Sequence, residues 1–244
     1  MKKISLLIYG VLLLALLVAP FIGFYPVFVM KVLCFALFAC AFNLLLGYTG
    51  LLSFGHAAFL GSAAYMTGQS LKVWHFTPEL ALIAGTAVGA MLGLVFGWLA
   101  IRRQGIYFSM ITLALAQMIY FVALQAPFTG GEDGLQSVPR GKLFGIVDLR
   151  NDLTMYYVAL VIVVAAFLLI ARTVHSPFGQ VLKGIKENEA RAISLGYDVN
   201  RFKLLAFVIS AALSGLAGSL KTLVLGFATL SDVHWTSSGH VILM

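Results

Sequence analysis

Apolar runs of about 20 residues recur seven times along this chain and dominate its sequence. An α-helix of roughly 20 residues crosses the hydrocarbon core of a bilayer, which is about 30 Å thick. Because 61% of the residues are hydrophobic and only 10% are charged, the composition lies outside that of soluble proteins. We predict an all-α, polytopic membrane protein with about seven transmembrane helices in a single domain, residues 1–244. The runs lie at 5–24, 27–46, 51–70, 79–101, 106–126, 153–171 and 202–226, the third being the weakest.

Basic residues gather at alternate ends of these predicted helices. If all seven helices alternate in direction, three basic groups fall on one side of the membrane, and positive residues favour the cytosolic side. The sequence therefore predicts a cytosolic N-terminus, a cytosolic loop at 172–203 and a periplasmic loop of mixed charge at 127–152. The basic groups are Lys2 with Lys3, Arg102 with Arg103, and the segment 172–203.

The N-terminal sequence Met-Lys-Lys precedes an apolar run, which is also the pattern of a signal peptide. That run extends as far as Phe24, and no Ala-x-Ala cleavage site follows it. We therefore expect the segment to be retained as the first helix.

Glycine recurs every fourth residue in the run at 79–101, which gives the predicted helix one bare face. Each glycine inside a helix lowers the stability of the helix by about 1 kcal/mol relative to alanine. Inside a membrane, close approach of a neighbouring helix compensates for this cost. We predict a helix–helix contact here, with the partner helix either in this chain or in another subunit. The residues are Gly85, Gly89, Gly93 and Gly97.

Polar side chains within the apolar runs are candidates for a translocation path. Asn43 and His56 flank the sequence Gly47-Tyr-Thr-Gly50, where a break in the helix would expose backbone groups to a cavity. Ser53 lies within the same stretch. The alternative is that each of these side chains bonds to a neighbouring helix or to its own backbone.

Several classes of protein lack their required residues in this sequence. No carboxylate lies inside an apolar run to carry a proton or sodium ion, Glu79 being at the edge of one, which disfavours a stand-alone channel or secondary carrier. An enzyme using Ser53 and His56 would lack a carboxylate to orient the imidazole. No phosphate-binding loop is present, so any nucleotide is expected on another subunit. We expect no catalytic residues, no metal and no cofactor in this chain, and no nucleic-acid partner, since the charges follow the membrane topology.

The polar segment 172–203 carries helical signals of its own. Ser176 and Pro177 are typical of the start of a helix, and apolar residues then follow at helical spacing up to Ile185. Asn188 is placed to cap a second short helix, which Gly196 would end in a left-handed conformation. A further cap for the last long helix is expected at Asn200.

These signals predict two short helices outside the membrane, between two transmembrane helices. We interpret them as a cytosolic surface for a protein partner. The alternative is an amphipathic segment that lies on anionic lipid, with Lys183, Lys186 and Arg191 toward the headgroups.

Four blocks of sequence resemble, in the same order, the LivM-type permeases of branched-chain amino acid ABC importers. The resemblance runs from about residue 40 to the end of the chain. The blocks are Asn43-Leu-Leu-Leu-Gly-Tyr-Thr-Gly-Leu-Leu-Ser-Phe-Gly-His-Ala-Ala-Phe59, Arg103-Gln-Gly-Ile-Tyr107, Thr129-Gly-Gly-Glu-Asp-Gly134, and Ser176-Pro-Phe-Gly179 through Gly196.

The resemblance implies a permease subunit in the bacterial inner membrane. It would work with a LivH-type permease, two cytosolic ATPases that bind ATP and magnesium, and a periplasmic binding protein. The segment 187–196 would be the helix that couples this subunit to the ATPases. Its expected contact residues are Glu187, Glu189, Ala190, Arg191, Ala192, Leu195 and Gly196.

Two departures from the family pattern limit what the resemblance implies. The family's loop has Glu-Ala-Ala-x-x-x-Gly, whereas here Glu189-Ala-Arg-Ala192 precedes Gly196, so the glutamate is one residue further from the glycine. The chain also ends at Met244 within an apolar stretch, where family members continue, so we expect a truncated sequence. Branched-chain amino acids are the expected substrates, with urea or short-chain amides as the alternative within the same class of importer.

Overall fold

The computed structural model describes residues 2–21, 23, 25–103, 105–145 and 147–242, with the backbone alone for residues 2–9 and 242. Each of the seven predicted apolar runs overlaps one long helix, although the first helix ends at Val18 and not at residue 24, and the third begins at His56 and not at residue 51. The long helices are α1 (Lys2–Val18), α2 (Pro26–Thr49), α3 (His56–Lys72), α4 (Pro78–Ala100), α5 (Ile106–Gln125), α6 (Asp152–His175) and α9 (Val199–Leu225).

Short elements connect these helices. A two-stranded antiparallel hairpin lies in the loop between α5 and α6, with Lys142 opposite Asp148. The short elements are η1 (Ala19–Phe21), η2 (Pro127–Thr129), η3 (Gly131–Asp133), β1 (Lys142–Leu143), β2 (Val147–Asp148), α7 (Pro177–Glu187), α8 (Glu189–Ser194), η4 (Leu230–Asp232) and α10 (Trp235–Ile242).

Five helices, α2, α4, α5, α6 and α9, are long and apolar enough to cross a membrane. Helices α1 and α3 have 17 residues each, fewer than the roughly 20 that a perpendicular span requires. The number of seven spans therefore stays a prediction. The third run is shorter than predicted because residues 51–55 form an irregular connection between α2 and α3.

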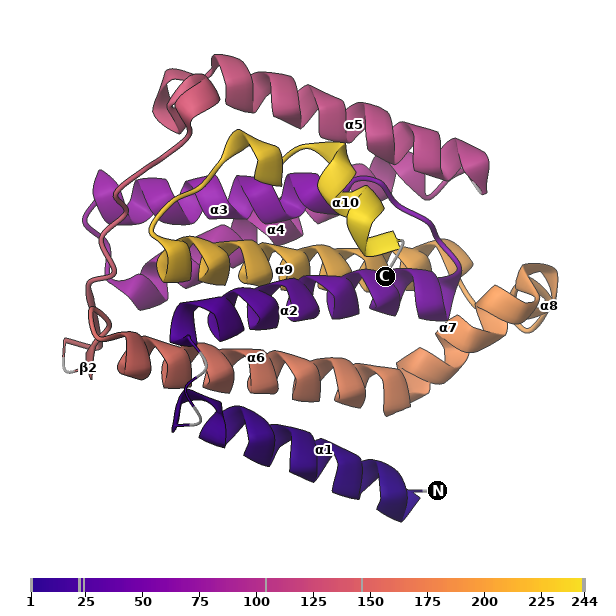
Figure 1. Ribbon diagram of the computed structural model, residues 1–244. Helices are drawn as coiled ribbons and strands as arrows, with labels where there is room; N and C mark the ends of the chain where they lie inside the picture. The colour runs from indigo at the N-terminus through magenta and orange to yellow at the C-terminus, as the bar shows by residue number, and fades with distance from the viewer. Residues whose placement is uncertain (1, 22, 24, 104, 146, 243–244) are drawn as a thin grey trace.

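Helix α9 lies at the centre of the bundle and packs against α2, α3 and α4 (Figure 1). Helix α6 covers α2, α5 packs on α3 and α4, and α1 lies at the edge beside α6. The Tyr156 hydroxyl on α6 donates a hydrogen bond to the carbonyl of Leu16 on α1. This arrangement makes α9 the element through which a movement at one end would reach most of the bundle.

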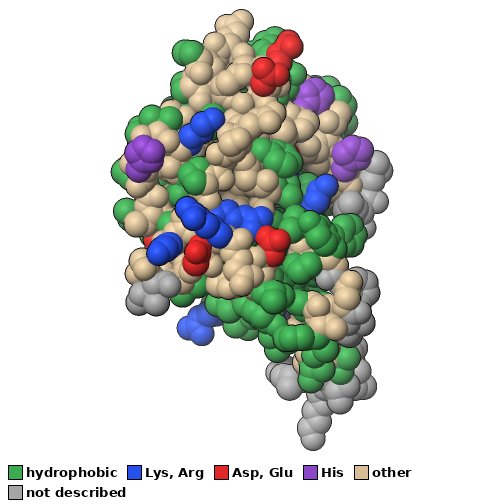
Figure 2. Space-filling view, turned by 60° about the vertical axis from the view of Figure 1, so that its left-hand side comes forward, with side chains coloured by type: hydrophobic (Ala, Val, Ile, Leu, Met, Phe, Trp, Pro, Cys, Tyr) green, Lys and Arg blue, Asp and Glu red, His purple; other side chains and the backbone are tan. Residues whose placement is uncertain are grey.

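The long helices run back and forth, so each connection lies at one of two ends. Helices α7 and α8 project from one end, at the right of Figure 1, where the α4–α5 connection and the start of α1 also lie. The α5–α6 loop lies at the opposite end, and Figure 2, with that end turned forward, shows basic and acidic side chains side by side. The basic segments thus share one end as the sequence predicts, while the side of the membrane stays a prediction.

The four glycines of α4 lie where this helix crosses α9 and α3. A Cβ atom at Gly89 would be 3.0 Å from the Ala211 carbonyl oxygen and 3.0 Å from the Gly215 Cα atom, both on α9. Contacts this tight leave no room for a side chain. The sequence left open which helix fills this face, and the structure places α9 of the same chain there. Gly85 and Gly93 also contact α9, and Gly97 lies beside Leu204 and Phe207.

Candidate functional site

Helices α7 and α8 form one compact body, which we call the α7–α8 unit. Ser176 accepts a hydrogen bond from the Gly179 amide at the start of α7, and Asn188 accepts one from the Arg191 amide at the start of α8. Gly196 follows α8 with φ of 86°, a left-handed conformation. These caps confirm the predicted pair of helices. The cap of α9 was predicted wrongly, because Asp198 and not Asn200 accepts the bond, from the Arg201 amide.

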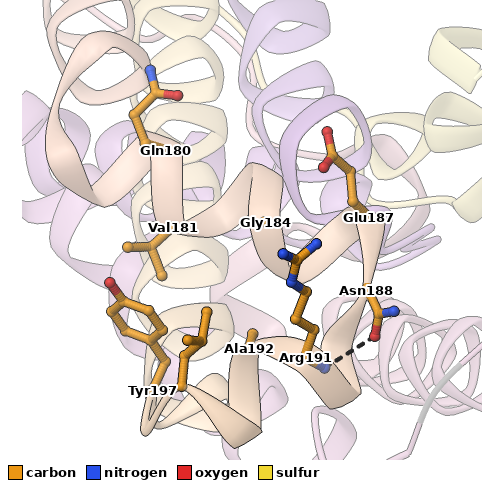
Figure 3. A pocket seen from close by; sticks show the side chains of 9 residues that line it. Gln180, Val181, Gly184, Glu187, Asn188, Arg191, Ala192 and Tyr197 are labelled. Atoms are coloured by element: carbon orange, nitrogen blue, oxygen red, sulfur yellow. Dashed lines mark hydrogen bonds between the residues drawn. The ribbon is translucent and has the colours of Figure 1, made fainter.

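A groove of about 410 Å³ lies between α7 and α8 (Figure 3). The Arg191 side chain extends from α8 toward α7 along this groove. Four of the predicted coupling residues line it, namely Glu187, Arg191, Ala192 and Leu195. Ala192 is buried at its floor, whereas Leu195 is 69% exposed at its rim. An exposed leucine beside charged side chains gives the groove both apolar and polar contacts for a partner.

The predicted coupling residues divide into two groups by exposure. Ala192 packs with Ile185 and Val199 in a small apolar cluster that joins α7, α8 and α9. Glu189 is half-buried. The other five are exposed and available to a partner, namely Glu187, Ala190, Arg191, Leu195 and Gly196.

Glu189, one of the predicted coupling residues, contacts Lys203 of α9 within the chain. Its contact to a partner stays a prediction. The Lys203 Nζ atom lies 2.7 Å from Oε2 of Glu189, and the lysine side chain is only 4% exposed. A charge that is buried in this way needs its counter-charge, since the unpaired ion would be costly. Glu189 therefore ties α8 to the central transmembrane helix.

The α7–α8 unit is also held against α2. The Lys186 ammonium donates a hydrogen bond of 2.8 Å to the carbonyl of Gly47. Lys183 lies over the ring of Tyr48, 5.4 Å from its centroid. The alternative interpretation directs both lysines toward lipid headgroups. In the structure both side chains have contacts on α2. The unit is fixed to two transmembrane helices.

His56 lies at a crossing of three helices. Its Nε2 atom is 2.9 Å from the Ser210 hydroxyl on α9, and that hydroxyl donates to the Ala41 carbonyl on α2. Since the Ser210 proton is used, Nε2 carries the hydrogen of this bond. The rings of Phe42, Phe59 and Phe207 surround the imidazole edge to face. This arrangement makes His56 a contact between helices.

The other predicted path residues lie along the second half of α2 and in the connection from α2 to α3. Ser53 is buried and accepts a hydrogen bond of 3.2 Å from the Gly55 amide. Asn43 is exposed on α2. Gly47 lies inside α2, which continues to Thr49, and Gly50 ends this helix with φ of 74°. The break therefore begins at Gly50, and a role of the five residues in a translocation path stays a prediction.

Sequence reasoning missed an ion pair between Lys221 of α9 and Asp232 of η4. Only 6% of Lys221 and 7% of Asp232 is exposed. Asp232 lies just beyond the last apolar run, so it is not among the carboxylates expected at membrane depth. The signal that would have found the pair is Lys221, a basic residue inside the run at 202–226.

Comparisons with known proteins extend this description. Residues 25–244 match the family model described as branched-chain amino acid transport system / permease component. The chain is 28% identical over 228 residues to the high-affinity branched-chain amino acid transport system permease protein LivM of Escherichia coli, covering 82% of this chain and 52% of that protein. It is also 28% identical over 176 residues to the tyrosine transport system permease protein of Clostridioides difficile, covering 70% of this chain and 55% of the relative.

A third relative is the ribose import permease protein RbsC of Haemophilus influenzae, 26% identical over 165 residues, which are 66% of this chain and 47% of the relative. The chain spans about half the length of the curated relatives it matches. No solved structure matches the chain. The relatives share the description of a permease but are named for different substrates, so they identify the kind of subunit more firmly than its substrate.

Proposed function

Because the chain belongs to the family of branched-chain amino acid transport system permease components, we propose that it forms part of the membrane path of an ATP-binding-cassette importer. The match and the apolar helices identify a multi-pass membrane protein. The observation that carries the proposal is the α7–α8 unit, an exposed body tied to α2 and α9 at one end of the bundle.

ATP and magnesium are proposed to bind to two partner ATPase subunits, since the sequence has no phosphate-binding loop. The exposed groove between α7 and α8 would receive an ATPase surface. A displacement of α8 would then pass through the Glu189–Lys203 ion pair to α9. Because α9 packs against α2, α3 and α4, its movement changes the centre of the bundle.

The remaining parts of the importer follow from the same proposal. A LivH-type permease would complete the path, and a periplasmic binding protein would deliver the substrate to the end that carries the α5–α6 loop. This loop presents both signs of charge, through side chains such as Glu132 and Lys142, to a docking protein. The location is the bacterial inner membrane.

Leucine, isoleucine and valine are the proposed substrates. The support is the description of the matching family and the name of the Escherichia coli relative. Relatives named for tyrosine and ribose show that related permeases carry other substrate names. A substrate test therefore has to include more than one class of compound.

Uptake by a reconstituted complex tests the proposal. The chain would be placed in proteoliposomes with its second permease, its ATPases and its binding protein, and labelled leucine and urea would be offered separately. We expect leucine uptake that requires both ATP and the binding protein. Uptake of urea but not of leucine would show that urea is the substrate. Leucine uptake without ATP would contradict an importer of this class.

A further inference from the structure

The Lys221–Asp232 pair joins two segments near the end of the bundle that carries the α5–α6 loop. Lys221 lies one turn before α9 ends at Leu225, and Asp232 lies in η4 after the chain has turned back. Both side chains are more than nine-tenths buried. The Lys221 ammonium also lies over the ring of Phe35 on α2, 5.7 Å from its centroid. Three segments thus meet around two opposite charges.

Stability alone gives little reason for this pair. Removing two ions from water is costly, and replacing a buried ion pair by apolar residues of similar size is often neutral or stabilising. Ionisable side chains at membrane depth are therefore uncommon and mark sites for substrates or ions.

A third polar group at this place lacks a partner. The Tyr65 hydroxyl of α3 is buried and makes no hydrogen bond to any residue that the structure describes. Tyr65 packs in one apolar cluster with Leu230 and Val233, which lie on either side of Asp232 in the chain. An unpaired buried hydroxyl is unfavourable unless something else bonds to it.

We propose that Lys221, Asp232 and Tyr65 bind the backbone groups of a zwitterionic α-amino acid. The Lys221 ammonium would bind the substrate's carboxylate, the Asp232 carboxylate would bind its ammonium, and the Tyr65 hydroxyl would donate to the carboxylate. One ion pair is exchanged for two, so no buried charge is left alone. This inference rests on the proposed function and names the residues that recognise the substrate.

The surroundings of the three residues suit an apolar substrate side chain. The buried cluster around Tyr65 consists of Ala64, Ala123, Leu135, Ala228 and Val233. A branched aliphatic group would be accepted here, whereas a polar one would lose its hydration without replacement.

In this structure the two charges bind each other, so the site is closed. Opening requires the segment 226–234 to move away from α9. That segment is attached at Ala228, which exchanges backbone hydrogen bonds with Leu135 of the α5–α6 loop. Its first residue, Gly226, has φ of 74° and ends α9. The closed and open arrangements are in equilibrium, and a binding protein that displaces the α5–α6 loop would shift this equilibrium toward the open one.

The test compares variants in the reconstituted complex. Lys221→Met with Asp232→Asn removes both charges without changing the net charge, and we expect leucine uptake to fall at least tenfold at normal membrane abundance. Tyr65→Phe removes one hydroxyl, and we expect a loss of several-fold. Arg201→Met with Asp198→Asn is the matched control, because it removes an exposed pair of opposite charges and asparagine can still cap α9; its uptake should stay within twofold of wild type.

A charge exchange separates binding from a structural role. Lys221→Asp with Asp232→Lys keeps an ion pair but reverses the orientation of a bound zwitterion, so we expect uptake to stay reduced at least tenfold. Restored uptake in this variant, or uptake within twofold of wild type in the neutral variant, would overturn the inference and leave the proposed function intact. Absence of uptake by the wild-type complex would overturn the proposed function and this inference with it.

Direct binding gives a second readout. Labelled leucine would be bound to the purified wild-type complex in lipid nanodiscs without binding protein. Unlabelled leucine should displace it at least tenfold better than 3-methylbutylamine, which lacks the carboxylate, or 4-methylpentanoate, which lacks the ammonium. Equal displacement by all three compounds would contradict recognition of the zwitterion.

Discussion

The Lys203 Nζ atom lies 2.7 Å from Oε2 of Glu189, which joins α8 to the central helix α9. The lysine is almost wholly buried and the glutamate side chain is 26% exposed. This pair gives the glutamate of the predicted coupling segment a role inside the chain, where it holds the α7–α8 unit in place for a partner.

Replacing Glu189 by lysine should uncouple transport, because it sets a like charge against Lys203. Removing one partner of a buried ion pair lowers the stability of a protein by about 3–5 kcal/mol, and the partial exposure of Glu189 favours the lower value. We expect the variant to reach the membrane and to lose ATP-dependent uptake. Glu189→Lys combined with Lys203→Glu restores the pair and should recover part of the uptake. Normal uptake by the single variant would contradict a role for the pair.

Replacing Gly196 by valine should distort the end of α8. The glycine has φ of 86°, and the space around it is open, so backbone strain and not a clash decides the result. A left-handed conformation costs a side-chain residue about 1–2 kcal/mol. We expect reduced co-purification of the ATPases, measured against Gly196→Asn as control, since asparagine tolerates this conformation. Equal co-purification of both variants would show that this turn is unimportant for docking.

Replacing Gly89 by leucine should weaken the contact between α4 and α9. The added side chain would meet the Ala211 carbonyl and the Gly215 Cα atom, and overpacking of this kind costs about 1–3 kcal/mol. We expect a lower melting temperature in detergent. Ala87→Leu is the control, because Ala87 is exposed on the same helix. Equal melting temperatures for the two variants would contradict the packing.

The local signals of the α7–α8 unit could be predicted from the sequence because each acts over a few residues. Ser176, Asn188 and Gly196 cap or end helices by contacts to backbone atoms three or four positions away. The cap of α9 was predicted two residues late, because Asp198 and Asn200 are both good capping residues and the sequence does not show which one has the right backbone.

Contacts between distant segments could not be predicted in the same way. The Glu189–Lys203 and Lys221–Asp232 pairs depend on how α8 and η4 fold back on α9. His56 was a candidate for the path because a polar residue in an apolar run either lines a path or bonds to a neighbouring helix or its own backbone. The sequence alone does not show which. Only the position of Ser210, 154 residues away, shows that it has a hydrogen-bond partner on another helix.

Labelling from the two sides of the membrane tests the topology. Gln180 in α7 and Gln136 in the α5–α6 loop are both exposed and lie at opposite ends of the bundle. With Cys34 and Cys40 replaced by alanine, we expect an impermeant thiol reagent to label Gln136→Cys from outside and Gln180→Cys only from the cytosolic side. Labelling of both from one side would contradict the topology and the proposed docking surface.

Cross-linking from Leu195, the residue after α8, to the ATPases tests the central claim most directly. Leu195 is 69% exposed at the rim of the groove, so a cysteine at this position should meet an ATPase docked on the α7–α8 unit. A short bifunctional thiol reagent would be applied to the assembled complex, with Gln136→Cys as control at the other end. We expect Leu195→Cys to cross-link to an ATPase subunit in proportions that change when ATP is added, and Gln136→Cys to give no such product. Failure of Leu195→Cys to cross-link in a complex that transports leucine would contradict the assignment of α7 and α8 as the docking surface.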